Sequence, residues 1–261
     1  MSAAITTDPV IEMTNVAAGT MRHPETPLVA DVNWTVAAGE FWVVAGLGGA
    51  GKSDFLMLAA GLLPPQRGRC RWFGAPLPEL EEAQLEFRLR VGLGFDGAHL
   101  FNELSLAENV ALPLRYHERG SAAEIAARVE QLLAWTELTP WADRSPGTLN
   151  RNWQKRAGLA RALALAPELL LLDMPLNGAD AQHSAWWLEA LTQLTTGHEL
   201  LPDRRPVTLV VTTNDLRPWE SGSRRYAVLR DRQFTPFTDW AAVTAGGAPV
   251  KELLARNLPH H

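Results

Sequence analysis

The apolar residues of this chain form short continuous blocks, separated by stretches in which apolar residues recur at helical spacing. Blocks that are this short and uniformly apolar are typical of strands covered on both faces of a sheet. They are Phe41–Ala45, Val91–Phe95, Leu169–Leu172 and Val207–Thr213. The stretches with helical spacing are Lys52–Leu63, Trp153–Leu165 and Asp180–Thr196. Strands that alternate with helices predict an α/β fold with a mainly parallel sheet.

The middle of the chain is richer in helical than in strand patterns. Ser121-Ala-Ala-Glu124 has the form of a capping box, which marks the start of a helix. An apolar stripe with helical spacing follows it, made of Ile125, Val129, Leu132 and Leu133. We therefore predict a helical subdomain at about residues 97–165, inserted into a single domain that spans residues 1–261.

The last part of the chain also departs from the alternation of strands with helices. Arg225–Arg230 and Gln233–Phe237 are strand-like and lie close together, which predicts a late antiparallel hairpin. Residues 239–261 form a C-terminal extension whose pattern is weakly amphipathic. We expect this extension to pack on its own domain or on a second copy of the same kind of domain.

Composition and charge exclude several classes of protein. Of the 261 residues, 46% are apolar, which is enough for a packed core, but no run approaches the 18 or so apolar residues of a membrane span. The formal net charge of −5 argues against nucleic-acid binding through a strong basic field. The single cysteine, Cys70, cannot form an internal disulfide or a multi-cysteine metal site, so we expect a small buried apolar residue there.

One glycine-rich segment carries recognisable chemistry. Residues 46–53 fit the pattern G-x-x-x-x-G-K-[ST] and lie between a predicted strand and a predicted helix, the context that this motif requires. Glycines let backbone N–H groups close around phosphate oxygens, and the helix N-terminus adds partial positive charge. Lys52 is expected to reach the β- and γ-phosphates, and the Ser53 hydroxyl to bind Mg²⁺. The residues predicted to contact the nucleotide are Gly46, Gly48, Gly49, Ala50, Gly51, Lys52, Ser53 and Asp54.

A second motif complements the first. Asp173 ends the apolar block Leu169–Leu172, as the Walker B aspartate that holds Mg²⁺ ends its strand. An aspartate at the end of a buried strand is commonplace alone, but it becomes informative when a phosphate loop precedes it. ATP and Mg²⁺ are therefore the predicted cofactors.

Together these motifs resemble those of the ATP-binding cassette (ABC) ATPases, over about residues 10–258. The large separation of Lys52 from Asp173 and the register of Leu149–Ala164 around the signature helix carry the resemblance. It implies a P-loop NTPase fold of the ABC type, with a mainly parallel sheet core, antiparallel β elements and the inserted helical subdomain. More narrowly, the chain is similar to the cassettes of Mla/Mce-type lipid transporters. The segments that carry this narrower similarity are Phe95–Phe101, Glu108–Arg115, Ala142–Pro146 and Val250–Leu254.

Several positions depart from the family pattern. The signature Leu-Ser-Gly-Gly-Gln is replaced by Leu149-Asn150-Arg151-Asn152-Trp153. Met174 stands where the family has the catalytic glutamate, Asn214 where it has the switch histidine, and Asp96 where it has the Q-loop glutamine. Asp54 replaces the threonine after Ser53, and residues 17–20 lack the aromatic residue that often stacks on adenine. The D-loop aspartate is retained as Asp180.

These departures predict impaired hydrolysis. Met174 cannot accept a proton from the attacking water, and a positioned general base typically contributes about 10²–10⁴-fold to the rate. Asp96 remains a possible third Mg²⁺ ligand beside Ser53 and Asp173. A carboxylate at Asp54 would repel phosphate unless it points away or shares the metal. Arg151 favours a rebuilt contact surface over a new phosphate site, because Trp153 beside it indicates packing.

Three functions follow from the resemblance and its departures. The first is an ABC transporter subunit, of lipid-transport type, that binds Mg-ATP and hydrolyses it poorly or not at all. The second is a working ATPase in which Asp96 or Asp215 replaces the missing base, and the third is a structural clamp that binds no nucleotide. A P-loop kinase fits the spacing of the motifs poorly.

The resemblance also implies partners and a location. ABC cassettes work as head-to-tail pairs, so we expect a second cassette, identical or an intact paralogue, and a transmembrane permease subunit. In such a pair this one chain would alter both composite nucleotide sites. Leu100, Phe101, Leu104 and Leu106 offer either an apolar groove for the permease or internal packing. The expected location is cytoplasmic, peripheral on the inner face of the cell membrane.

Overall fold

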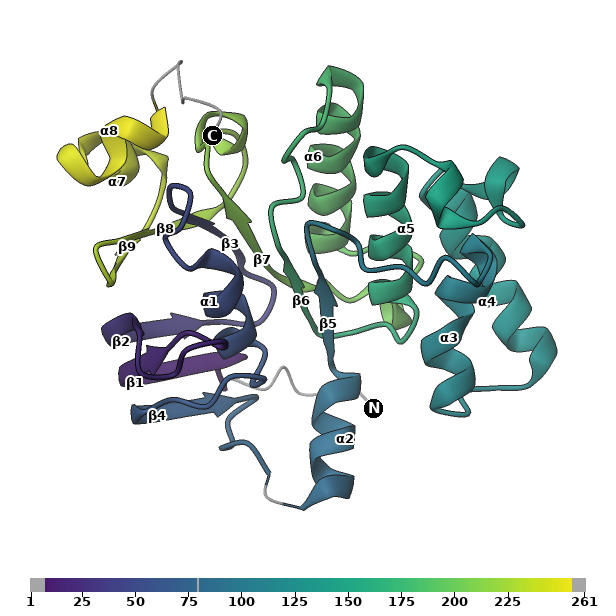
Figure 1. Cartoon of the computed structure of the whole chain (residues 1–261), viewed down its shortest axis with the longest axis horizontal. Helices are drawn as coiled ribbons and strands as arrows, with labels where there is room; N and C mark the ends of the chain where they lie inside the picture. The colour runs from purple at the N-terminus through teal and green to yellow at the C-terminus, as the bar shows by residue number, and fades with distance from the viewer. Residues whose placement is uncertain (1–7, 79, 255–261) are drawn as a thin grey trace. The chain divides into compact units, whose positions relative to one another are not determined.

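A computed structural model describes residues 8–78 and 80–254 of the chain (Figure 1). They form two compact units: one contains the residues up to Phe87 and those from Asn214 onward, and the other contains Arg88–Thr213. We call them the first and the second unit. The last residues of the predicted C-terminal extension, 255–261, lie outside the described residues.

The first unit contains two groups of strands. Strand β1 (Ile11–Gly19) pairs antiparallel with both β2 (Pro27–Val36) and β4 (Arg67–Trp72). Strand β3 (Phe41–Ala45) is buried throughout and pairs parallel with β8 (Arg225–Arg230). The predicted hairpin is confirmed, because β8 pairs antiparallel with β9 (Gln233–Phe237). Cys70 on β4 is buried as expected, and burial raises the pKa of its thiol to about 11.

Helix α1 (Lys52–Ala59) follows the phosphate loop in this unit and is shorter than its sequence pattern suggested. The prediction that it runs to Leu63 is wrong, because Gly61 adopts a left-handed conformation (φ +70°). The Leu62 N–H then bonds the Met57 carbonyl at 2.9 Å, which closes the helix end before Pro64. The other α-helices among the described residues of this unit are α2 (Glu81–Leu89), whose last two residues belong to the second unit, α7 (Trp240–Ala245) and α8 (Ala248–Leu254).

The second unit has a short parallel sheet and the predicted helices. Strand β6 (Leu169–Leu172) lies between β5 (Val91–Gly94) and β7 (Thr208–Thr213), and both pairings are parallel. Helix α4 (Ala122–Trp135) begins at Ser121, whose side chain forms the predicted capping box with Glu124. Its neighbours in the helical part are α3 (Leu106–Tyr116) and α5 (Arg151–Leu163), which Figure 1 shows side by side with it. Helix α6 (Ala181–Thr196) starts from Asp180.

Strands, helices and their pairing thus agree with the α/β expectation, including antiparallel β elements beside a parallel sheet. Within residues 8–78 and 80–254, every helix is too short or too polar to cross a bilayer.

Candidate functional site

The phosphate loop lies in the first unit, between the end of β3 and the start of α1. Gly51 adopts a left-handed conformation (φ +80°), and a Cβ added there would come within 2.2 Å of the Leu28 side chain. A Cβ on Gly48 or Gly49 would meet nothing within 4 Å. The loop is therefore tight on its inner side, where only glycine fits at Gly51, and open on its outer side.

The lysine of this loop is held close to the loop itself. Lys52 is 9% exposed, and its Nζ donates hydrogen bonds to the carbonyl oxygens of Gly46 (2.7 Å) and Leu47 (2.9 Å). These bonds place the ammonium against the loop that it is predicted to serve. Ser53 is the second residue of α1 and is exposed.

Asp54 does not aim at the loop. Its Oδ1 accepts a hydrogen bond from the Met21 backbone N–H at 3.2 Å, in the connection between β1 and β2. The repulsion that a carboxylate would exert on bound phosphate is reduced by this orientation. Its predicted contact with nucleotide stays a prediction.

A cavity of about 460 Å³ opens beside the phosphate loop within the first unit. Its lining includes the loop residues Leu47–Gly51, the β1–β2 connection at Thr20 and Thr26, and the turn between β8 and β9. The volume lies in the range of small-molecule binding sites. The open outer side of the loop and this adjoining cavity together fit the size and chemistry of a nucleoside triphosphate.

The Walker B aspartate lies in the second unit, directly after β6. Asp173 is 7% exposed, and its Oδ1 accepts a hydrogen bond from the Thr212 hydroxyl at 2.6 Å. The same hydroxyl oxygen accepts a hydrogen bond from the Met174 N–H at 2.9 Å. Met174 itself has a positive φ of 50°. Thr212 on β7 therefore fixes the direction of both residues at the end of β6.

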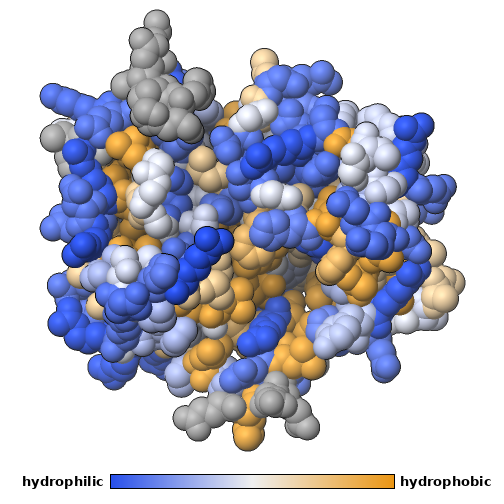
Figure 2. Space-filling model, viewed as in Figure 1, coloured by the Kyte–Doolittle hydropathy of each residue, from blue (hydrophilic) through white to orange (hydrophobic). Residues whose placement is uncertain are grey.

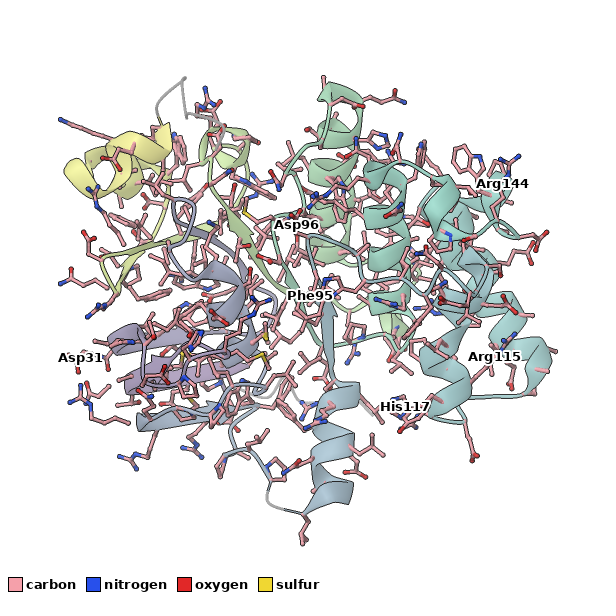
Figure 3. All side chains as sticks on the ribbon, in the orientation of Figure 1. Asp31, Phe95, Asp96, Arg115, His117 and Arg144 are labelled. Carbon is pink, nitrogen blue, oxygen red and sulfur yellow. The ribbon has the colours of Figure 1, made fainter. Side chains whose placement is uncertain are left out.

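Asp96 follows β5 in the same unit (Figure 3) and is engaged by two cations from helix α5. Its carboxylate forms an ion pair with Arg151, and its Oδ1 lies 2.6 Å from the Lys155 Nζ. The Asn177 side-chain amide also donates to its Oδ2 at 3.1 Å. We call Asp96, Arg151, Lys155 and Asn177 the Asp96 cluster.

Lys155 is the buried centre of this cluster. Its side chain is 3% exposed, and its Nζ also donates to the carbonyl oxygens of Met174 (3.0 Å) and Asn177 (2.6 Å). Burial lowers the pKa of Lys155 below its ordinary value, and the hydrogen bond to Asp96 opposes that shift. The ammonium ties together the end of β5, helix α5 and the segment after β6.

The sequence analysis did not identify this role of Lys155, although a signal was present. Arg151 and Lys155 are four residues apart and share one face of α5, although the predicted helix began only at Trp153. Two cations on one face imply an acidic partner, and Asp96 was already singled out as an unusual carboxylate.

The replaced signature segment forms internal contacts. The Asn150 side chain caps α5 by accepting a hydrogen bond from the Trp153 N–H at 3.2 Å. The Trp153 ring packs against Trp141, with ring centroids 4.5 Å apart, and edge-on against His183. The packing interpretation of this segment therefore agrees with the contacts seen, and Arg151 pairs with Asp96 inside its own chain.

A buried arginine completes this packing. The Arg156 guanidinium is 4.5 Å from the Trp153 ring centroid and 3.9 Å from that of Trp186, and it forms an ion pair with Glu137. Burial lowers the pKa of Arg156 despite Glu137. Of the two adjacent tryptophans in α6, Trp187 is buried (2% exposed) and Trp186 covers the arginine.

The remaining predicted residues lie at other points of the chain. The Asp180 side chain caps α6 by accepting from the His183 N–H at 2.8 Å. Asn214 belongs to the first unit and Met174 to the second. The Asp215 carboxylate accepts hydrogen bonds from the Arg217 guanidinium at 2.9 and 2.6 Å. In the part of the chain that the structure describes, no three His, Cys, Asp or Glu side chains group so that they could hold a metal ion.

Comparison with known proteins identifies the family of this chain. The family model described as ABC transporter matches residues 29–177, which include both the phosphate loop and Asp173. The chain belongs to this family of ATP-binding cassettes.

Two curated proteins are similar in sequence to this chain. A protein of Mycobacterium tuberculosis, named as a probable ribonucleotide transport ATP-binding protein, mkl, is 39% identical over 157 residues, which are 60% of this chain and 44% of mkl. The methionine import ATP-binding protein MetN 2 of Pseudomonas aeruginosa is 34% identical over 74% of this chain and 56% of its own length. The chain spans about half the length of these relatives.

Solved structures show the same fold. The dimeric structure of MJ0796, titled a bacterial ABC transporter cassette, is 28% identical and matches with a TM-score of 0.75 over 85% of this chain and 95% of that one. The cbiO1 protein of Clostridium perfringens matches with a TM-score of 0.76 over 91% of both chains at 20% identity, which speaks for the fold alone.

Proposed function

We propose that this chain is the nucleotide-binding subunit of an ABC transporter of the Mla/Mce lipid-transport type, and that it binds Mg-ATP but hydrolyses it poorly or not at all. The observation that carries the second half is the Asp96 cluster together with Met174. Mg-ATP, when bound, would supply the triphosphate and the metal charge. The residues of the chain determine whether the nucleotide is held and whether it is hydrolysed.

Nucleotide binding is supported by the first unit. The phosphate loop retains its glycines, Lys52 and Ser53, and its outer side is open to a cavity of suitable volume. Asp54 accepts a hydrogen bond from the Met21 N–H, and this orientation reduces its repulsion of bound phosphate. Lys52 would hold the β- and γ-phosphates, and the Ser53 hydroxyl would bind Mg²⁺.

Weak hydrolysis is supported by the state of each candidate base. Met174 has no proton-accepting side-chain group. Asp96 is paired with Lys155 and Arg151, and Asp215 with Arg217, so each carboxylate already contacts cationic side chains of its own chain. To contact an attacking water or Mg²⁺, Asp96 would have to give up its contacts with two cations.

The lipid-transport assignment rests on the similarity to Mla/Mce cassettes, and the geometry supports it in one respect. Three of the four similar segments lie together in the second unit. The Leu106 and Ala107 N–H groups of α3 bond the carbonyls of Arg144 and Ala142, and the Asn109 side chain bonds both the N–H and the carbonyl of Phe101. Residues that are far apart in sequence thus lie together in one region of the second unit, with Leu106 and Asn109 buried beneath its surface.

That surface is also our candidate for contact with the permease. A groove of about 590 Å³ runs between α3 and α4, lined by Ala107, Ala111, Ile125, Val129 and Leu133 with charged residues at its rim. Figure 2 shows apolar side chains at the surface over these helices. Of the four leucine and phenylalanine residues singled out from sequence, Leu106 is fully buried and Phe101 is 52% exposed. An apolar groove of this kind suits a helix of a transmembrane partner.

The partner cassette and the location follow from the same proposal. A second cassette, identical or an intact paralogue, would meet Asn150–Trp153 in place of a normal signature. A chain that works beneath a permease would lie on the cytoplasmic side of the membrane, bound to it through that permease. The cargo named for the relatives differs between ribonucleotide and methionine, so those names favour no single substrate.

The test is binding and turnover by the purified chain, alone and with its co-purifying partner. We expect micromolar Mg-ATP binding that Lys52→Ala abolishes, and a phosphate-release rate no higher than that of Lys52→Ala. Turnover near that of intact cassettes would refute poor hydrolysis, and Asp96→Asn and Asp215→Asn would then show which carboxylate serves as base. Absence of Mg-ATP binding would favour the structural clamp instead.

A further inference from the structure

The cavity beside the phosphate loop has a wall that comes from the C-terminal helix. Besides the loop, its lining includes the β8–β9 turn at Arg230–Arg232 and two residues of α8, Glu252 and Leu253. All of these residues belong to the first unit. A segment more than 190 residues after the phosphate loop thus helps to shape the same cavity.

Helix α8 is firmly attached to that wall. Leu253 is 2% exposed, and its carbonyl accepts a hydrogen bond from the Leu216 N–H at 3.0 Å. Val250, one turn earlier, is 1% exposed. At the lip of the cavity the Arg230 Nη1 lies 3.6 Å from the Glu252 Oε2.

The residues that line the cavity differ between its two ends: the phosphate loop forms one end, and mainly aliphatic and charged side chains form the other. The glycine loop with Lys52 is suited to the phosphates, so the nucleoside must extend toward the rest of the cavity. Among the described residues that line it, no aromatic ring is present, and the side chains that offer apolar surface are aliphatic, including Leu28, Val228 and Leu253. A base that is not stacked on a ring depends more strongly on such aliphatic contacts and on the groups at the lip.

We propose that α8 is the wall that holds the nucleoside end of a bound nucleoside triphosphate: Leu253 packs against the base or ribose, and Glu252 keeps Arg230 at the lip. This inference rests on the proposed nucleotide binding and adds to it a residue set that contributes to affinity. It also makes the C-terminal extension responsive to nucleotide, because filling the cavity shields α8.

The test compares two probes, Mg-ATP and Mg-tripolyphosphate, by calorimetry on the full chain. The tripolyphosphate carries the phosphates without a nucleoside. Leu253→Ala should weaken Mg-ATP at least fivefold and change Mg-tripolyphosphate less than twofold. Val250→Ala is the matched control, since it truncates an equally buried residue of the same helix that is not among those lining the cavity, and it should change neither probe more than twofold.

Hydrogen exchange of the wild-type chain gives a second readout that does not depend on a variant folding. Amides of residues 248–254 should exchange more slowly with Mg-ATP than with Mg-tripolyphosphate. Equal losses of Mg-ATP affinity in Leu253→Ala and Val250→Ala would contradict the proposed role of α8, and so would amide exchange that both probes slow to the same extent. If the wild-type chain binds neither probe, both the proposed function and the role of α8 are wrong. If the chain binds both probes and Leu253→Ala leaves its affinity for Mg-ATP unchanged, only the role of α8 is wrong.

Discussion

The phosphate loop of this chain keeps the residues of the family pattern, whereas the signature region does not. In the first unit, the loop keeps the residues that hold phosphate, and its open side faces a cavity. In the second unit, positions that differ from the family pattern make contacts within that unit: Asp96 with Arg151 and Lys155, and Trp153 with Trp141 and His183. Under the proposed function, the first unit binds the ligand, whereas the replaced residues of the second unit contribute to stability. Variants in the two units should therefore fail in different measurements.

The largest effect is expected on removing the carboxylate of the Asp96 cluster. In Asp96→Ala, Lys155 would remain buried with only two carbonyl oxygens as acceptors. Breaking a buried pair from one side costs roughly 3–5 kcal/mol, and we expect about 3 kcal/mol because the Asp96 side chain is 25% exposed. Urea unfolding measures it.

The matched control for that loss is Asp143→Ala, which removes an exposed carboxylate in the same unit and should change the unfolding free energy by less than about 0.5 kcal/mol. The opposite pattern would contradict the comparison. If Asp96→Ala kept its stability and instead lost the Mg²⁺ dependence of ATP binding, Asp96 would be a metal ligand.

Lys52→Ala should show the converse behaviour. Loss of the ammonium that faces the phosphates should weaken Mg-ATP by at least about a hundredfold, or about 2.7 kcal/mol. Stability should change little, because the Lys52 Nζ donates to two carbonyl oxygens of its own loop, which water can reach once the side chain is truncated. Calorimetry and urea unfolding of the same variant test both statements. Arg69→Ala, an exposed cation of the first unit, is the control; equal loss of affinity there would indicate a general field rather than a site.

The contrast between the units also explains what could be predicted from sequence. The strand of the phosphate loop, β3, was predictable because a buried parallel strand is uniformly apolar, and so was Leu169–Leu172. Strands β1, β2 and β4 were not individually predicted, because their buried and exposed positions alternate irregularly and β-bulges interrupt their register.

The residues of the candidate site were also predictable only in part. A phosphate loop is local in sequence, so its residues were named before the structure. The Asp96 cluster joins residues 55 and 59 positions apart, and only the packing of α5 beside β5 brings Arg151 and Lys155 to Asp96. Helix α3 was also missed, although Ser105 and Glu108 form the same capping box as Ser121 and Glu124.

Restoring the family residue at Trp153 should sharpen the comparison. In Trp153→Gln the contacts with Trp141, His183 and Arg156 are lost, and the half-buried site makes a loss of about 2 kcal/mol reasonable. Urea unfolding measures this loss, and we expect no gain in ATP turnover.

Asn150→Ser is the control, because it also restores the family residue, and serine caps helices about as well as asparagine does. Its unfolding free energy should stay within about 0.5 kcal/mol of wild type. If Trp153→Gln were as stable as Asn150→Ser, the signature segment would not be serving as internal packing.

The smallest effect concerns an ion pair that joins the starts of β5 and β6 within the second unit. The Arg90 guanidinium donates two hydrogen bonds to Glu168 at 2.7 and 3.0 Å, and these bonds, with the charges of Arg90 and Arg205, lower the pKa of Glu168. A carboxylate whose pKa is lower in the folded state stabilises the protein above its unfolded pKa of about 4.3. That contribution disappears as the pH falls through the lower folded value. Because both side chains are more than a third exposed, solvent screening limits it to about 0.5–1 kcal/mol.

Glu168→Gln should therefore unfold at lower urea concentration than wild type at pH 7, and the difference should shrink between about pH 4 and pH 3. Glu86→Gln, at an exposed position of α2, controls for the general effect of losing a carboxylate. If the difference between Glu168→Gln and wild type stayed constant down to pH 3, it would come from packing rather than charge. Electrostatic stability in the second unit would then rest on pairs with a buried cation, such as Lys155–Asp96 and Arg156–Glu137, since a partly exposed pair such as Arg90–Glu168 would have contributed none.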